Sequence, residues 1–152
     1  GAPFIQFDEP AIGFGRWDSK LARKALGIAV RGLKTKTAVV TYFGSLNGGF
    51  DALQRLPIDV IGVDVVSDPK TLAVLKRSKI KKALAVGCMD ARNTKLESIQ
   101  ELQKIFRALE KLVPSDRLYV SPNCGLEFLP HSQALAKLRR LTAAVRAYKK
   151  SR

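Results

Sequence analysis

The sequence predicts an α/β fold in which a parallel sheet is covered by helices. Apolar runs alternate with amphipathic segments, and this strand-then-helix order repeats five times along the chain. Continuous apolar strands separated by helices are typical of parallel sheets, because a parallel connection needs a crossover that is usually helical. The chain has 152 residues, which suits one domain with a sizeable core, so we expect a single domain over residues 1–152.

The first unit joins a strand over residues 4–10 to a helix over residues 18–33. The strand ends in two carboxylates and a proline, and either Asp18 or Ser19 can cap the helix that follows. Apolar residues at helical spacing share one face of this helix, the pattern of a helix that packs on a core. These residues are Leu21, Ala25, Ile28 and Ala29.

The next two units follow the same order. A strand over 37–44 is almost entirely β-branched or aromatic, and a short helix over 49–56 follows it. A third strand over 60–66 leads into a helix over 68–78, which has a proline in its first turn, where proline is well tolerated. A fourth strand is predicted over 82–91.

The clearest helix signal lies over residues 98–113. Ser98 opens the helix and Glu101 stands three positions later, which is the pattern of a capping box. A fifth strand over 117–122 and a last helix over 131–148 complete the series. The apolar stripe of helix 98–113 consists of Ile99, Leu102, Ile105, Phe106, Leu109 and Leu112.

Two parallel architectures fit five such units. A doubly wound sheet usually carries a glycine-rich phosphate loop after its first strand, but the "GFGR" stretch at 13–16 lacks the third glycine. A (βα)8 TIM barrel has eight units, and five are the larger part of one. We therefore predict a partial (βα)8 TIM barrel of about five βα units.

Composition narrows the setting of the protein. Two cysteines, Cys88 and Cys124, are too few for a disulfide framework, which favours a reducing, cytoplasmic compartment. No apolar run approaches the roughly 18 residues of a membrane span, so we expect no membrane segment. Lys and Arg number 27 against 13 Asp and Glu, a net charge of +14. Such a surplus attracts polyanions, although a lysine-rich solvated surface explains it equally well.

Polar side chains recur where the predicted strands end. The carboxyl ends of parallel strands meet at one edge of the sheet, where α/β proteins place their chemistry. Each of these residues has an ordinary structural explanation, such as capping or a loop hydrogen bond, but their recurrence at five successive strands favours a shared site. They are Asp8, Glu9, Tyr42, Asp64, Asp90, Arg92, Asn93 and Cys124.

Four stretches resemble the cobalamin-independent methionine synthase family in order and spacing. They are "IQFDEPAIG", "VVTYFGSL", "VGCMDARNTKLES" and "LYVSPNCGLEFLP". The resemblance spans essentially the whole chain and matches the carboxyl-terminal part of one barrel. Family enzymes carry two related barrels. The catalytic barrel holds a zinc ion that binds the homocysteine thiolate, and the other is zinc-free and helps to bind methyltetrahydrofolate.

When the family's functional residues are matched to this sequence one by one, some positions agree with the resemblance and others do not. Asp8 matches the aspartate that binds the amino group of homocysteine, and Glu9 stands beside it. Cys124 matches the zinc-ligating cysteine, and Asp64 falls near the ligand glutamate. Tyr42 and Gly44, however, occupy the positions of the His-x-Cys pair of ligands. Because a zinc site needs three or four protein ligands, we expect no zinc on this chain alone. "TYFGSL" resembles the zinc-free, amino-terminal barrel.

The resemblance implies a methyltransferase that moves a methyl group from methyltetrahydrofolate to homocysteine. We expect this chain to be part of such an enzyme, closer to its folate-binding, zinc-free barrel, and to be inactive when isolated. Its partners would be the remaining strands of the barrel, in the same polypeptide or in a partner subunit, and a catalytic methionine synthase domain. The alternative is a catalytically degenerate member of the family whose basic surface binds RNA or the ribosome.

Overall fold

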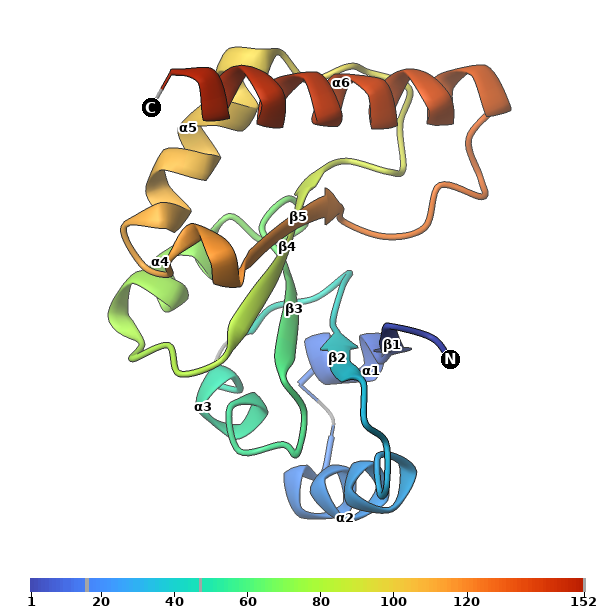
Figure 1. Cartoon of the computed structure of the whole chain (residues 1–152), viewed down its shortest axis with the longest axis vertical. Helices are drawn as coiled ribbons and strands as arrows, with labels where there is room; N and C mark the ends of the chain where they lie inside the picture. The colour runs from blue at the N-terminus through green and yellow to red at the C-terminus, as the bar shows by residue number, and fades with distance from the viewer. Residues whose placement is uncertain (16, 47, 152) are drawn as a thin grey trace.

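The computed structural model describes residues 1–15, 17–46 and 48–151, and it contains a parallel sheet of five strands in the order β1-β2-β3-β4-β5 (Figure 1). Its strands are β1 (Phe4–Asp8), β2 (Lys36–Val40), β3 (Val60–Asp64), β4 (Ala83–Met89) and β5 (Leu118–Pro122). The helices are α1 (Pro10–Gly13), α2 (Ser19–Ala29), α3 (Phe50–Leu53), α4 (Lys70–Arg77), α5 (Ile99–Glu110), a 3-10 turn η1 (Ser115–Arg117) and α6 (His131–Lys150).

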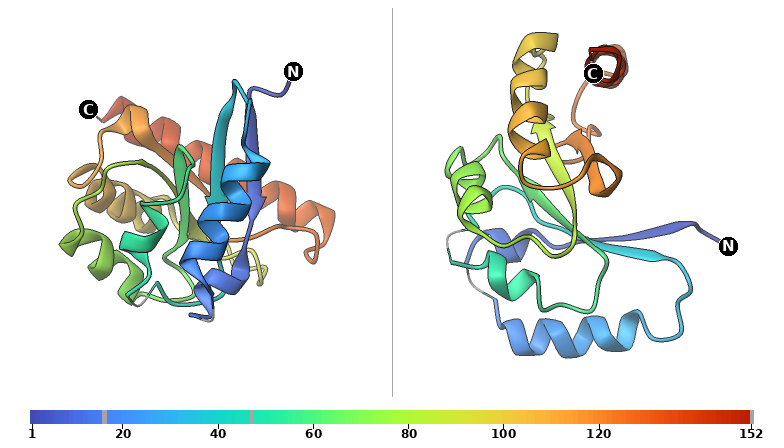
Figure 2. Two further views of the ribbon diagram at one scale, coloured as in Figure 1. Left: turned by 90° about the horizontal axis from the view of Figure 1, so that it is seen from below. Right: turned by 60° about the vertical axis from the view of Figure 1, so that its left-hand side comes forward.

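The strand order confirms the prediction of a partial barrel. Each strand pairs with the next one along the chain, whereas the strand order of a doubly wound sheet reverses at a switch point. The sheet is curled, as Figure 2 shows from two directions. At its amino-terminal end, the ring of Phe4 on β1 lies 6.0 Å from the ring of Tyr119 on β5, although these strands are at opposite edges. The fold is therefore a half-barrel.

Local signals set the helix starts as expected. The Asp18 side chain caps α2 by accepting hydrogen bonds from the amides of Lys20 and Leu21. Ser98 and Glu101 form the predicted capping box at the start of α5. The sequence did not indicate α1, a single turn whose first residue is a proline and whose cap is the Glu9 side chain. Within the described part of the chain, no helix is long and apolar enough to cross a membrane.

The core lies between the outer face of the sheet and the helices. Alternate residues of each inner strand point outward to this core, as the two-residue period of a strand requires. Cys88 belongs to it and is 2% exposed. The strand residues of this core include Val39, Ile61, Val63, Leu84 and Val86, and the helices add Leu53, Leu75, Leu102, Phe106 and Leu109.

The predicted inner face of the first long helix is wrong. Leu21 and Ile28 of α2 are 64% and 60% exposed, and Ala25 is also exposed. Ala22 and Leu26 pack against the core instead. Helix α2 connects β1, an edge strand of the sheet, to β2. Its second apolar stripe remains on the surface, which spacing alone could not reveal.

The concave face of the sheet depends on small residues. A Cβ atom at Gly62 on β3 would lie 2.6 Å from Cγ2 and 2.7 Å from Cα of Val40 on the paired strand β2. Real Cβ atoms do not approach so closely, so this position requires glycine while β2 and β3 keep their register.

We expect Gly62→Ala to lower the free energy of unfolding by about 1–3 kcal/mol, because the added methyl group must push apart two paired strands. Gly27→Ala is the matched control. At Gly27, inside α2, the nearest atom to an added Cβ is Cγ of Pro57 at 4.0 Å, so this change should stabilise the chain by up to about 1 kcal/mol. Urea unfolding of the two variants measures both effects. Equal effects of the two substitutions would contradict the packing argument.

Candidate substrate-binding rim

The carboxyl ends of the five strands place the predicted polar residues on one rim of the half-barrel. Asp8 ends β1, Asp64 ends β3, and Asp90 directly follows β4. Tyr42 follows β2, and Cys124 follows β5. Because these strands are parallel neighbours, the loops that follow them all leave the sheet at the same end, the carboxyl end of the strands. We use the term rim for these strand ends and the loops that continue them.

Asp64 is the structural centre of the rim. It is 2% exposed, and its Oδ1 accepts the amides of Val66 at 2.8 Å and Ser67 at 2.9 Å. Its Oδ2 accepts the Ser67 hydroxyl at 2.6 Å, the Phe43 amide at 3.3 Å and Nδ2 of Asn123 at 3.1 Å. The donors come from the loops after β2, β3 and β5. One buried carboxylate thus ties three loops together, and its two oxygens are fully engaged.

Asn123 extends this network to the fourth strand. Its side-chain oxygen accepts the Ala91 amide at 2.9 Å, while its Nδ2 donates to Asp64. The side chain is 3% exposed. The close approach depends on Gly87, because a Cβ there would lie 2.5 Å from Cα of Asn123. The loop after β4 is therefore fixed relative to the loops after β3 and β5.

An aromatic pair and an arginine stand beside the carboxylates. The rings of Tyr42 and Phe43 meet edge to face, with centroids 4.7 Å apart. The guanidinium carbon of Arg92 lies 4.7 Å from the centroid of the Phe43 ring, within the range of a cation–π contact. Phe43 has φ of 67°, a left-handed conformation that is uncommon for a bulky residue. Its amide donates to Asp64, which helps to hold this strained turn.

The Tyr42 hydroxyl lies in an acidic environment. Burial raises its pKa, and the nearby charges of Asp8, Cys124, Glu127 and Glu9 raise it further. These pKa effects require that residues from the first, second and fifth strand ends lie near one another. At neutral pH the hydroxyl keeps its proton and can donate a hydrogen bond to a ligand.

The Cys124 thiol is held in its protonated form. Burial is the largest cause that raises its pKa, followed by the negative charges of Asp64 and Glu127. Asp90 raises the pKa further, while the Arg92 guanidinium lowers it. A thiol with a raised pKa is a poor nucleophile at neutral pH, because the thiolate is the reactive species. Cys124 is therefore a neutral group of the rim.

The loop after β4 is anchored from the far side by α6. Lys137 is completely buried, and its Nζ donates to the Lys95 carbonyl and pairs with Oε2 of Glu97 at 3.2 Å. The other oxygen of Glu97 accepts the Asp90 amide at 2.8 Å. Arg140 adds a bond to the Glu97 carbonyl at 3.0 Å. Helix α6 thus fixes the segment that carries three candidate binding residues.

Within that loop, Asp90 organises its neighbours. Its Oδ1 accepts the Arg92 amide at 2.8 Å, and its Oδ2 accepts a hydrogen bond from the Asn93 side chain. Arg92 and Asn93 are exposed and face solvent beside the rim. The Arg92 guanidinium, which contacts the Phe43 ring, is therefore a positive group at the rim.

A backbone contact closes the rim beside Tyr42. A Cβ atom on Gly44 would lie 2.0 Å from the carbonyl oxygen of Gly13 and 2.7 Å from its Cα. A Cβ on Gly13 would lie 3.0 Å from the Tyr42 carbonyl oxygen. Helix α1 therefore packs its last residue directly on the turn after β2. No side chain fits at position 44 unless α1 moves.

The residues of the rim do not fit a zinc ion. Among residues 1–15, 17–46 and 48–151, no group of three or more His, Cys, Asp or Glu residues is arranged to hold a metal. Zinc requires three or four such ligands. Both oxygens of Asp64 are occupied by protein donors, and position 44 has no room for a cysteine side chain.

Sequence analysis selected most of the residues at the strand ends, but it did not select the residues that hold the loops of the rim in place. The structure brings Asp8, Glu9, Tyr42, Asp64 and Cys124 together and places Asp90, Arg92 and Asn93 on the adjoining loop. Glu9 also caps α1, accepting the Ala11 amide at 3.2 Å. The residues that sequence analysis did not select are Phe43, Ser67, Glu97, Asn123, Glu127 and Lys137. Asn123 and Glu127 flank Cys124, and that proximity was the one signal available for them.

Known proteins share this half-barrel. A B12-independent methionine synthase from Shewanella sp. W3-18-1, solved in complex with selenomethionine, superposes with a TM-score of 0.84 at 28% identity. The alignment covers 99% of this chain and 50% of that one. A putative vitamin-B12 independent methionine synthase from Listeria monocytogenes has a TM-score of 0.74 at 13% identity, which shows a common fold. The fold and rim thus define part of a parallel barrel of the methionine synthase type.

Comparisons of the amino-acid sequence indicate the same family as the comparison of structures. A family model described as "Cobalamin-independent synthase, Catalytic domain" matches residues 1–147, so the chain belongs to this family. The methionine synthase of Methanocaldococcus jannaschii is 31% identical over 97% of this chain, which spans 50% of that relative. A probable 5-methyltetrahydropteroyltriglutamate–homocysteine methyltransferase of Schizosaccharomyces pombe is 32% identical over 96% of this chain and 20% of its own length. The chain thus spans half or less of these curated relatives.

We expect Cys124 to react slowly with iodoacetamide at neutral pH and to reach its half-maximal rate above the ordinary thiol pKa of about 8.5. Glu127→Gln should shift this midpoint to lower pH, because it removes a negative charge that raises the pKa. Peptide mass spectrometry separates Cys124 from Cys88, whose pKa burial raises to about 12. Asp116→Asn, at the other end of the sheet, is the control and should leave the midpoint unchanged. A midpoint below about 8 in the unsubstituted chain would contradict the acidic environment.

We expect Lys137→Met to loosen the loop after β4. The substitution keeps an unbranched apolar stem but removes the bonds to Lys95 and Glu97, so trypsin should cut faster after Arg92 and Lys95. The free energy of unfolding should fall by about 1–3 kcal/mol. Lys149→Met, at an exposed position of the same helix, is the control and should change neither measurement. Unchanged cleavage in Lys137→Met would mean that α6 does not hold the loop.

Proposed function

We propose that this chain is part of a cobalamin-independent methionine synthase, which transfers a methyl group from methyltetrahydrofolate to homocysteine. Within that enzyme it forms the carboxyl-terminal part of one barrel, of the zinc-free type that binds the folate. Methionine synthases of about twice this length share its sequence, and the Shewanella relative was solved with a methionine analogue bound. The cytoplasm, where thiols stay reduced, suits both the substrate and the two free cysteines.

The observation that carries the proposal is the rim of carboxylates around Tyr42. Burial and the charges of Asp8, Glu127 and Glu9 raise the pKa of the Tyr42 hydroxyl, which keeps its proton, so the rim offers negative charge together with a hydrogen-bond donor. An amino acid or a folate carries amino groups that bind carboxylates through charge-assisted or neutral hydrogen bonds. Asp8, Glu9, Tyr42, Asp64, Asp90, Arg92 and Asn93 are the proposed substrate-binding residues. Asp64 acts in this set mainly by positioning the loops.

The packing at position 44 supports the proposed zinc-free character. A family ligand at this place would need a side chain, and the Gly13 backbone occupies the space that its Cβ would take. The methyl transfer needs an activated thiolate, which a metal can supply by stabilising the deprotonated sulfur. Among the described residues, no group of three ligands is arranged to hold zinc, and the pKa of Cys124 is raised. A separate catalytic domain must therefore activate homocysteine, and the isolated chain is expected to be inactive.

The half-barrel also needs the strands that would close it. The outer edges of β1 and β5 carry backbone groups with no partner strand in the described sheet. Leu21 and Ile28 of α2 are exposed apolar side chains that a helix of the closing units could cover. We propose that residues outside this chain, in the same polypeptide or in a partner subunit, supply three further strand–helix units.

Calorimetry with methyltetrahydrofolate triglutamate, together with metal analysis of the purified protein, tests the proposal. We expect saturable folate binding, less than one equivalent of zinc and no turnover when homocysteine is added. Asp8→Asn and Asp90→Asn should each weaken binding by roughly tenfold, because each loses a charged hydrogen-bond acceptor. Asp116→Asn, far from the rim, is the control.

Two results would overturn the proposal. One tightly held zinc per chain, lost in Cys124→Ser, would contradict the zinc-free assignment. Folate affinity that is unchanged in both rim variants would mean that the carboxylates do not form the binding site.

A further inference from the structure

The charges of the molecule are segregated. The rim gathers carboxylates at the strand ends, whereas the last helix, α6, contains no Asp or Glu along residues 131–150. Two of its basic side chains point inward, since Lys137 is buried and Arg140 donates to the Glu97 carbonyl. The remaining basic side chains of α6 are exposed: Arg139, Arg146, Lys149 and Lys150.

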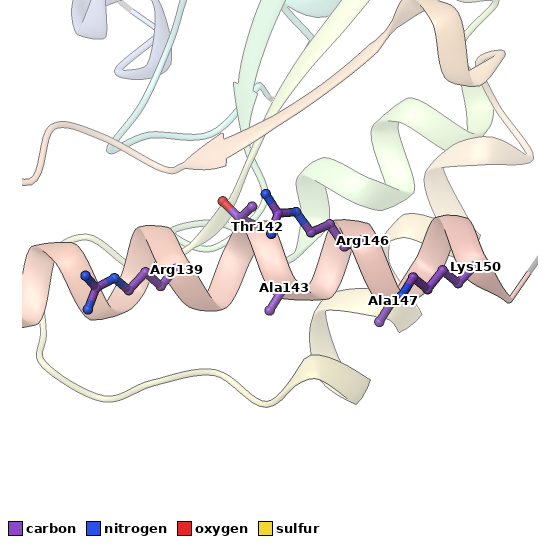
Figure 3. Close-up of a pocket in the computed structure, with 6 residues that line it drawn as sticks. All are labelled: Arg139, Thr142, Ala143, Arg146, Ala147 and Lys150. Carbon is purple, nitrogen blue, oxygen red and sulfur yellow. The ribbon is translucent and has the colours of Figure 1, made fainter.

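Three of these cations lie in one row on the outer face of α6. Figure 3 shows Arg139, Arg146 and Lys150 along the helix, with Ala143 and Ala147 between them; Thr142 completes the lining of this shallow surface. Residues 139, 143, 146, 147 and 150 recur at helical spacing, opposite the buried face formed by Leu141 and Ala144. At 1.5 Å per residue the row is about 16 Å long. We call Arg139, Arg146 and Lys150 the α6 basic row.

Nothing in the described structure neutralises the basic row. None of its three side chains takes part in an ion pair or a hydrogen bond with residues 1–15, 17–46 or 48–151. The alanine side chains between the three cations are short, so a partner can approach the helix backbone closely. The row lies on the side of α6 opposite Leu141 and Ala144, the residues that this helix buries.

We propose that the α6 basic row is a binding surface for the phosphate backbone of RNA. A row of about 16 Å with three exposed cations can contact consecutive phosphates of one strand, each of which carries a negative charge. The row contains neither an aromatic ring for base stacking nor an amide side chain for base edges. It therefore binds the backbone without reading the sequence.

A membrane surface is the less suitable partner. A helix that lies on a bilayer inserts large apolar side chains between the lipids. The outer face of α6 offers alanine and threonine between its cations, so it can be attracted to anionic lipid but has nothing to insert. A surface that carries positive charge but no large apolar side chain is better suited to bind a polyanion in solution than a lipid bilayer.

Fluorescence anisotropy with a labelled, mixed-sequence RNA of about 20 nucleotides tests the proposal over roughly 50 to 300 mM salt. The test variant carries Arg139→Gln, Arg146→Gln and Lys150→Gln, which keep helix-forming side chains of similar length. The matched control replaces three exposed lysines elsewhere, Lys76→Gln, Lys104→Gln and Lys111→Gln, and lowers the net charge equally. Thermal unfolding followed by circular dichroism verifies that both variants are folded. If the triple α6 variant does not fold, the single variant Arg146→Gln takes its place.

In the α6 variant we expect the slope of log K against log salt to become shallower by about two, because each phosphate contact on a single strand contributes about 0.7. Affinity should fall by roughly tenfold or more, while the control should keep most of its affinity and slope. Equal losses in both variants would show diffuse attraction to net charge and overturn the proposal. Binding to vesicles containing phosphatidylserine but not to RNA would overturn it as well.

Discussion

The rim of this half-barrel depends on the hydrogen bonds of one buried carboxylate. Asp64 accepts hydrogen bonds from the turn after β2, from the loop that follows its own strand and from Asn123 after β5. A buried carboxylate is stable only when donors satisfy it, so the loops must keep these positions for the fold to persist. Asn123 also accepts a hydrogen bond from the Ala91 amide, which fixes the loop after β4 relative to Asp64. Four strand ends are thereby held in one arrangement.

Two further constraints shape what the rim can do. The backbone contact between Gly13 and Gly44 leaves no room for a side chain in the turn after β2. Burial, together with the acidic surroundings, raises the pKa of Tyr42 and of Cys124 and keeps both side chains protonated. Together they favour a surface that binds polar ligands by charge and hydrogen bonding over one that activates a thiol. The basic outer helix and the acidic rim are then two chemically opposite faces of one small molecule.

Much of this arrangement could be predicted because it rests on local signals. The alternation of strands and helices, the Asp18 cap and the Ser98–Glu101 capping box are each written in a few adjacent residues, and the structure confirms them. Polar residues at strand ends could be grouped because parallel strands bring their carboxyl ends together. The supports of the rim could not be predicted. Lys137 looks like any surface lysine in the sequence, and its burial arises where α6 crosses a loop 40 residues earlier.

The sequence by itself determined the alternation of strands and long helices, because short-range periodicity encodes it. The resemblance of four stretches indicated the family, and the positions of polar residues at strand ends indicated most of the residues of the rim. Only the tertiary structure decided which face of α2 is buried, which carboxylate is saturated by donors and why position 44 must be glycine. These properties depend on contacts between segments that are distant in sequence, such as Gly13 with Gly44 and Asp64 with Asn123. Such contacts form only when the sheet curls, so no local pattern of residues records them.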